Sequence, residues 1–197
     1  MGALQEEGKI AGYLLNGGKS RRMNGENKLF LQYKGVSFYS YIRRALSAFP
    51  VVYLSVAEEN PMLYRELSLP TVTDKYPGLG PMGGIYSGLL ECPEEALFVA
   101  ACDTPLIEKE TVDRVTEEYG KTGKLTVVKT GERIHPLFGI YPKSVLPVME
   151  KMIAEGNYRM QDLLVRAEAD VLVLEPENRV GINVNTQEDY RRLCMSK

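Results

Sequence analysis

The chain contains 197 residues, of which 44% are apolar and 25% are charged, and it carries a formal net charge of −2. This size and composition are typical of one globular domain with its own core, so we expect a single domain over residues 1–197. They do not imply a broad nucleic-acid-binding surface, which needs a strong basic excess, and no apolar run reaches membrane-spanning length, so we expect a soluble protein.

Short apolar runs alternate along the chain with stretches of helical periodicity. We predict strands over residues 10–15, 51–56, 70–73, 96–101 and 125–128. Apolar residues recur at helical spacing over residues 38–49, 62–67, 83–90, 109–119, 144–153 and 160–167. Ser37 is placed to cap the first of these helices. Such alternation predicts an α/β fold of three layers, a Rossmann-like α/β/α arrangement in which helices cover both faces of a mostly parallel sheet.

The first strand leads into a glycine-rich loop that also carries several cations. Asn16, Gly17 and Gly18 free the backbone to turn and to offer N–H groups to an anion. The cations that follow are Lys19, Arg21, Arg22 and Lys28. Glu26 is the one acid among them, so the loop suits a triphosphate better than a single phosphate. An ordinary turn with solvated charges is the alternative.

Two phosphate-binding motifs match the sequence only in part. Residues 18–20 supply the end of a P-loop, but its first glycine falls on Tyr13. Residues 78–83 satisfy the dinucleotide-binding pattern Gly-x-Gly-x-x-Gly, which would indicate an oxidoreductase. Residues 74–77 separate that pattern from the strand, however, and Pro81 removes a backbone donor from the phosphate turn. We therefore keep the oxidoreductase only as an alternative.

Asp103 is the first candidate for a metal-binding carboxylate. It follows the apolar strand 96–101 and precedes Pro105, which is placed to open the next helix one or two residues later. The residues alone leave a second role open, in which Asp103 caps that helix. Because the carboxyl ends of parallel strands share an edge, we expect Asn16, Asp74 and Asp103 to lie along one edge of the sheet.

Cysteine and histidine usage argues against two kinds of site. Cys92, Cys102 and Cys194 are far apart, and His135 is the only histidine. Neither a zinc site nor a disulfide framework follows from this pattern. Reduced cysteines fit the cytoplasm, where we expect the protein to be located.

Five segments of the sequence resemble those of a known family. Residues 15–23, Leu-Asn-Gly-Gly-Lys-Ser-Arg-Arg-Met, with Lys28 beyond them, resemble the Leu-x-Gly-Gly-x-x-x-Arg-Met…Lys signature of nucleotidyltransferases. The match is closest to the molybdenum cofactor guanylyltransferases. Four further segments agree in order, namely Asp74 with residues 80–84, residues 102–105, residues 135–141 and residues 181–189. The loop signature is shared with cytidylyl and sugar-phosphate transferases, which stay alternatives.

The resemblance implies a fold like that of the nucleotide-diphospho-sugar transferases, and a role for each matching residue. The reaction would be transfer of GMP from GTP to the terminal phosphate of molybdopterin with its metal, with release of pyrophosphate. The implied catalytic residues are Arg22, Lys28 and Asp103, and Asp103 with Asn185 would hold Mg²⁺. The other implied binding residues are Leu15, Asn16, Gly17, Gly18, Asp74, Gly80, Gly83, His135 and Asn183. Other proteins of molybdenum cofactor assembly are candidate partners.

Alternative roles and three departures from the family pattern qualify these implications. A histidine before proline, as His135 is, is usually a turn residue, and Thr186 or Asn185 could simply cap the last helix. Asn16 stands where the family usually has Ala, Asn27 where Asp is common, and Ala57 where a nucleotide-binding Asn is often found. The departures leave base selectivity open and keep a non-catalytic nucleotide-binding protein as an alternative.

Overall fold

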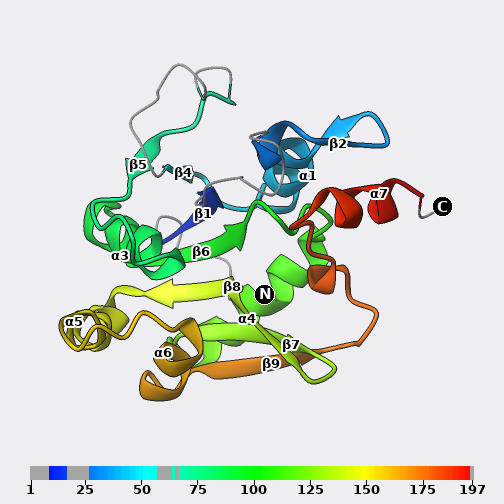
Figure 1. Cartoon of the computed structure of the whole chain (residues 1–197). Coiled ribbons are helices and arrows are strands. Elements are labelled where there is room, and N and C mark those ends of the chain that lie inside the picture. The colour runs from blue at the N-terminus through cyan, green and yellow to red at the C-terminus, as the bar shows by residue number, and fades with distance from the viewer. Residues whose placement is uncertain (1–8, 17–26, 57–63, 65–66, 196–197) are drawn as a thin grey trace.

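The computed structural model describes residues 9–16, 27–56, 64 and 67–195. Within these residues, seven strands form one sheet in the order β5-β4-β1-β6-β8-β7-β9, and β2-β3 is a separate hairpin (Figure 1). The strands of the sheet are β1 (Ile10–Asn16), β4 (Val52–Val56), β5 (Thr71–Thr73), β6 (Ala96–Ala101), β7 (Thr126–Thr130), β8 (Arg133–Pro142) and β9 (Asp170–Leu174). The hairpin consists of β2 (Gln32–Tyr33) and β3 (Val36–Ser37).

Helices connect most of these strands. The α-helices are α1 (Phe38–Ala45), α3 (Pro81–Glu91), α4 (Lys109–Thr122), α5 (Leu146–Ala154), α6 (Met160–Arg166) and α7 (Gln187–Met195). Short 3₁₀ helices are η2 (Lys28–Phe30), η4 (Lys143–Val145) and η5 (Arg179–Gly181). Within the described residues, no helix is both long and apolar enough to cross a membrane.

The prediction of a mostly parallel sheet is confirmed. β1 pairs in parallel with β4 and β6, β4 with β5, and β7 with β9. β8 runs antiparallel between β6 and β7. The five predicted strands all form, with ends that differ by at most two residues from the predicted ones.

Two strands of the seven-stranded sheet, β8 and β9, were not predicted, and His135 proves to be a strand residue rather than a turn residue. In β8 the pairing with β7 jumps from His135 to Gly139, so Pro136 falls in an irregular stretch that has no ladder partner in β7. A proline tolerates this position because it has no N–H to contribute to a ladder. β9 is an edge strand.

The helix predictions are confirmed in position and wrong in detail. Ser37 caps α1 as predicted, since its Oγ accepts the N–H of Ser40 at 3.1 Å, but the helix ends at Ala45 instead of Phe49. The prediction that Pro105 opens the next helix within two residues is wrong, because α4 begins at Lys109. The helix expected over residues 62–67 lies mostly outside the described residues.

Helices cover both faces of the sheet, which gives the three predicted layers. In Figure 1, α3, α5 and α6 lie on the left of the strands. They bury Tyr13 and Leu15 of β1 on their face, whereas Leu14 points into the core beneath α1 and α4. A smaller cluster joins Phe38 of α1 to Val184 and Leu193, and so holds the C-terminal helix α7 against the segment around η2.

Glycines let α3 approach β1 closely. The Tyr13 hydroxyl donates to the carbonyl of Gly84 at 2.7 Å. A Cβ atom on Gly88 would lie 2.6 Å from the Tyr13 ring, closer than any real Cβ contact. Tyr13 is fully buried, so the ring cannot move aside at low cost. This contact fixes α3, and therefore its N-terminus, relative to the end of β1.

Gly139→Ala tests the packing of β8 between its two neighbours. A Cβ atom there would lie 2.1 Å from the Thr126 carbonyl oxygen and 2.9 Å from the Val127 Cα, so a central strand would have to shift. We expect unfolding free energy to fall by about 3 kcal/mol, a loss of roughly 6–12 °C in melting temperature by differential scanning calorimetry.

Gly120→Ala is the matched control for this substitution. Gly120 lies in α4, and a Cβ atom there meets nothing within 4 Å. Alanine forms helices better than glycine, so this variant should gain about 0.5–1 kcal/mol. Equal melting temperatures for the two variants would contradict the register of β8.

Candidate functional site

Three of the candidate residues lie along one edge of the sheet, as predicted. Asn16 is the last residue of β1, and Asp74 directly follows β5. Asp103 follows β6 with only Cys102 between them. The parallel registers bring these strand ends level, since Asn16 pairs with Val56. The order β5-β4-β1-β6 places β5 and β6 three strand spacings apart, about 14 Å. An extended ligand the size of a nucleotide spans such an edge.

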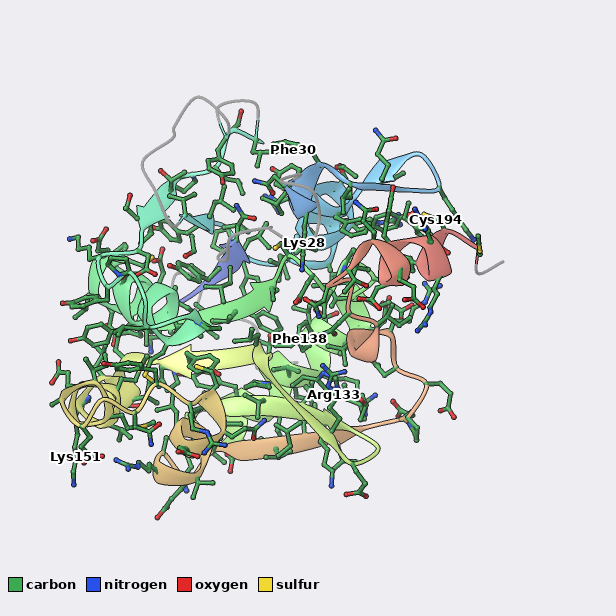
Figure 2. The ribbon with its side chains drawn as sticks, in the orientation of Figure 1. Lys28, Phe30, Arg133, Phe138, Lys151 and Cys194 are labelled. Atoms are coloured by element: carbon green, nitrogen blue, oxygen red, sulfur yellow. The ribbon has the colours of Figure 1, made fainter. Side chains whose placement is uncertain are left out.

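Lys28 and Asn185 meet at this edge although they lie 157 residues apart in sequence. The Lys28 ammonium donates to the Asn185 Oδ1 at 3.0 Å. Lys28 is the first residue of η2, which Asn27 caps by accepting the Leu29 N–H at 3.0 Å. Figure 2 shows Lys28 near the middle of the molecule, between the end of β6 and the start of α7.

Asp103 belongs to the same group of residues. Its backbone carbonyl accepts the N–H of Val184 at 2.7 Å, which docks the segment containing Asn185 against the end of β6. Burial raises the pKa of the Asp103 carboxyl, and the nearby charges of Lys28 and Arg133 act against that rise. The fold therefore disfavours the negative charge of Asp103 unless a cation accompanies it.

The oxygens of this group fit a small, hard cation. Asp103 offers a carboxylate and Asn185 an amide oxygen, and the buried Oδ1 of Asn183 has no hydrogen-bond partner among the described residues. The described part of the chain contains no cluster of three or more His, Cys, Asp or Glu side chains. A cation bound here would therefore use one carboxylate, amide oxygens and ligand oxygens, which suits Mg²⁺ better than zinc.

Cys102 lies beside Asp103 and is buried. Burial, and next the charge of Asp103, raise the pKa of its thiol to about 12. The thiol therefore stays protonated at neutral pH and is a poor nucleophile. This leaves Cys102 a packing role at the end of β6.

Of the three residues that could have capped a helix, Asp103, Thr186 and Asn185, only Thr186 does so with its side chain. Asp103 does not cap α4, whose N-cap is Glu108. Thr186 does cap α7, because its Oγ1 accepts the N–H of Asp189 at 3.1 Å and Asp189 accepts the N–H of Thr186 at 2.8 Å. The side chain of Asn185 takes no part in this cap and instead contacts Lys28.

Asp74 faces the N-terminus of α3. Its Oδ1 accepts the N–H of Tyr76 at 2.9 Å, and Oδ2 has no hydrogen-bond partner among the described contacts. A Cβ atom on Gly83 would lie 3.0 Å from Oδ1, and Gly80 caps α3 with a φ of +62° that favours glycine. In a dinucleotide fold this helix end receives a pyrophosphate, so the Asp74 carboxylate counts against the oxidoreductase alternative.

His135 makes its side-chain hydrogen bond inside the β7–β8 hairpin, and its Cε1 would lie 3.9 Å from a Cβ atom on Gly181, four residues before Asn185. The His135 Nε2 and the Thr130 Oγ1 share a buried hydrogen bond of 2.7 Å. Burial lowers the pKa of the imidazole, and the positive charge of Arg133 lowers it further. Among the described residues, no hydrogen bond connects His135 with Lys28, Asp103 or Asn185. The geometry therefore gives His135 a structural contact inside the β7–β8 hairpin.

The other candidates divide into buried and undescribed residues. Leu15 is buried beneath α3, where its Cδ1 would lie 2.9 Å from a Cβ atom on Gly84. Gly17, Gly18 and Arg22 lie outside the described residues.

Sequence reasoning missed Tyr64 and Arg133. The Tyr64 hydroxyl accepts hydrogen bonds from the side-chain amides of Asn16 and Asn27. Arg133 is exposed, and its charge reaches Asp103 and His135. Arg133 could have been found as a cation two residues before the His-Pro pair, whereas Tyr64 had no local signal.

Comparison with known proteins gives a consistent group of relatives. Residues 12–171 match the family described as "MobA-like NTP transferase domain". A relative from Clostridium perfringens, named a probable molybdenum cofactor guanylyltransferase, is 32% identical over 96% of this chain and 98% of its own. A relative of the same name from Aquifex aeolicus is 34% identical over 92% of this chain and 88% of its own.

A solved structure has the same fold. Molybdopterin-guanine dinucleotide biosynthesis protein A from Archaeoglobus fulgidus matches with a TM-score of 0.76 and 23% identity. The match covers 93% of this chain and 96% of the other.

Two neighbouring substitutions separate the cap of α7 from the site. Thr186→Ala removes the cap and should lower unfolding free energy by about 1 kcal/mol without changing ligand binding. Asn185→Ala should leave the melting temperature unchanged, because the one hydrogen bond of its side chain among the described residues is an exposed one with the Lys28 ammonium, but it should weaken binding of magnesium with GTP. Thermal unfolding with and without this ligand measures both effects. The reverse pattern would move the site away from Asn185.

Proposed function

We propose that the chain is a molybdenum cofactor guanylyltransferase, because it belongs to the family of MobA-like NTP transferase domains and is a nucleotidyltransferase. It transfers GMP from GTP to the terminal phosphate of molybdopterin carrying molybdenum, and releases pyrophosphate. The observation that carries the proposal is the contact of Lys28 with Asn185 beside the half-buried carboxylate of Asp103. An ammonium group close to oxygen ligands supports the proposal that a triphosphate and its metal bind together here.

The names of the curated relatives support the choice of substrates. Those from Clostridium perfringens and Aquifex aeolicus are at least 32% identical to this chain over most of both lengths. The solved structures support the fold alone. Contacts with other proteins of cofactor assembly, and a cytoplasmic location, stay predictions from the sequence.

In the reaction, an oxygen of the acceptor phosphate forms a bond to the α-phosphorus of GTP, and the bond from that phosphorus to the bridging oxygen of pyrophosphate breaks. Such chemistry needs alignment and charge neutralisation more than covalent help. Lys28 holds the triphosphate and offsets the negative charge that develops on the pyrophosphate. Arg22 and the backbone of Gly17 and Gly18 are proposed to assist it.

Asp103 and Asn185 are proposed to hold Mg²⁺, and the orphaned Oδ1 of Asn183 offers a further oxygen. When bound, the ion neutralises phosphate charge and orients the α-phosphate for attack. The carboxylate of Asp103 suits this task, because partial burial raises its pKa and a bound cation would favour its charged form.

Asp74 is proposed to bind the nucleoside. Its Oδ2 is free to accept a hydrogen bond, and Tyr76 fixes the orientation of the carboxylate by donating to Oδ1. A Cβ atom on Gly80 would meet nothing within 4 Å, so a ligand can approach the start of α3 there, whereas the missing side chain of Gly83 makes room for the Tyr76 carbonyl and the Asp74 carboxylate.

A panel of ligands in a thermal-shift assay tests the choice of nucleotide. GTP with Mg²⁺ should raise the melting temperature more than CTP, UTP, ATP or NAD. A ligand that binds only the native state adds about 2.7 kcal/mol at roughly 100 times its dissociation constant. If CTP gives the largest shift, the guanylyl assignment is wrong while the class stands. If NAD does, the nucleotidyltransferase mechanism fails as well.

Asp103→Asn tests the metal-binding carboxylate. We expect pyrophosphate release to fall by roughly 10²–10³-fold, because electrostatic stabilisation of the transition state is lost. The melting temperature without ligand should stay constant or rise, since the fold disfavours the charged carboxyl that the substitution removes.

Asp113→Asn is the control, because within the described part of the chain Asp113 forms an ion pair with just the exposed Lys109, one turn away on α4. It should react at the wild-type rate. Normal pyrophosphate release by a folded Asp103→Asn variant would show that the metal is held elsewhere.

A further inference from the structure

We infer, on the basis of the proposed function, that Tyr64 is a positioning residue that fixes Lys28 in the triphosphate site through Asn27. Its hydroxyl accepts a hydrogen bond from the Asn16 amide at 3.0 Å and one from the Asn27 amide at 3.2 Å. Asn27 directly precedes Lys28, whose ammonium donates to Asn185. A continuous set of contacts therefore runs from Tyr64 to the far side of the site.

The hydrogen bond between Asn27 and Tyr64 has a defined direction, because Asn27 also contacts Leu29. The Asn27 Oδ1 accepts the N–H of Leu29 at 3.0 Å, and a backbone N–H can only donate. The Nδ2 of Asn27 must therefore face Tyr64 and donate to its hydroxyl. The amide serves at once as the cap of η2 and as its link to Tyr64, so a shift of Tyr64 would be transmitted to the first turn of η2.

One hydroxyl joins two points that are distant along the backbone path. Asn16 ends β1, which the sheet holds rigidly, and Asn27 begins the segment that carries Lys28. The bond from Asn16 anchors the hydroxyl to the sheet, and the bond to Asn27 passes that anchorage on to η2. Through Tyr64, the position of Lys28 is tied to the same sheet edge that carries Asp103.

The side-chain amides of Asn16 and Asn27 are both suited to the Tyr64 hydroxyl. Both donate to the same oxygen, and this oxygen can accept both bonds while its own proton points elsewhere. Alanine at position 16 could not donate at all, and aspartate at position 27 could only accept. The departures at Asn16 and Asn27 are therefore two halves of one arrangement around Tyr64.

Tyr64→Phe tests this role, because it keeps the ring that packs against the core and removes only the hydroxyl. The probe is inorganic tripolyphosphate with Mg²⁺, measured by isothermal titration calorimetry, and it reports on Lys28 whatever the base preference. We expect the dissociation constant to rise roughly threefold to tenfold, the worth of one or two hydrogen bonds.

The same substitution in a Lys28→Met background separates positioning from general destabilisation. If Tyr64 acts through Lys28, it should cause no further loss in that background. A merely structural role would weaken binding by the same factor in both backgrounds, which would overturn the inference. So would wild-type affinity in Tyr64→Phe, or a wild-type chain that does not bind tripolyphosphate.

Tyr39→Phe is the matched control. The Tyr39 hydroxyl donates to the Leu67 carbonyl at 2.9 Å, close in sequence to Tyr64, and among the described residues it makes no hydrogen bond to Asn27 or Lys28. Its affinity for tripolyphosphate should equal that of the wild type, and a loss matching that of Tyr64→Phe would overturn the inference. A wild-type chain that binds tripolyphosphate but prefers CTP to GTP would refute the proposed function and leave the role of Tyr64 standing.

Discussion

The site depends on one costly feature, the half-buried carboxylate of Asp103, whose pKa is raised by burial. A charge in that position must be balanced, and Lys28 lies near enough to lower the cost. The ammonium of Lys28 is in turn shared with Asn185, so the three side chains depend on one another although they come from distant parts of the sequence. A bound metal and triphosphate would supply the remaining balance of charge, which couples ligand binding to the stability of the site.

The fold serves this interaction by bringing together three segments. Parallel strands deliver Asn16, Asp74 and Asp103 to one edge of the sheet. The C-terminal segment reaches the same edge because the N–H of Val184 binds the Asp103 carbonyl, while the buried side chains of Val184 and Leu193 pack beside Phe38. η2 is held by Asn27 and Tyr64. Each contact limits the freedom of a different segment, so together they preorganise the site before any ligand arrives.

Local patterns predicted the elements that depend on local chemistry. The strand over residues 96–101, the cap at Ser37 and the shared edge of the parallel strands all follow from periodicity and capping rules. β8 escaped prediction because Pro136 marks a turn in most sequences, and only the jump in pairing with β7 makes room for it. The contact of Lys28 with Asn185 and the two bonds to Tyr64 are long-range, and no spacing in the sequence encodes them. The resemblance to a family identified most of the candidate residues, but it did not predict the contacts between their side chains.

Lys28, Asp103 and Asn185 are proposed to form one site for a metal and a triphosphate. The most direct test is the crystal structure of the protein with Mn²⁺ and a GTP analogue that cannot react, with the ion located by anomalous scattering. We predict that the ion lies about 2.0–2.2 Å from a carboxylate oxygen of Asp103, the distance usual for a small octahedral cation, with the Asn185 amide beside it and the Lys28 ammonium against the phosphates. An ion bound to the triphosphate away from Asp103, or phosphates out of reach of Lys28, would show that these residues do not form the metal and triphosphate site.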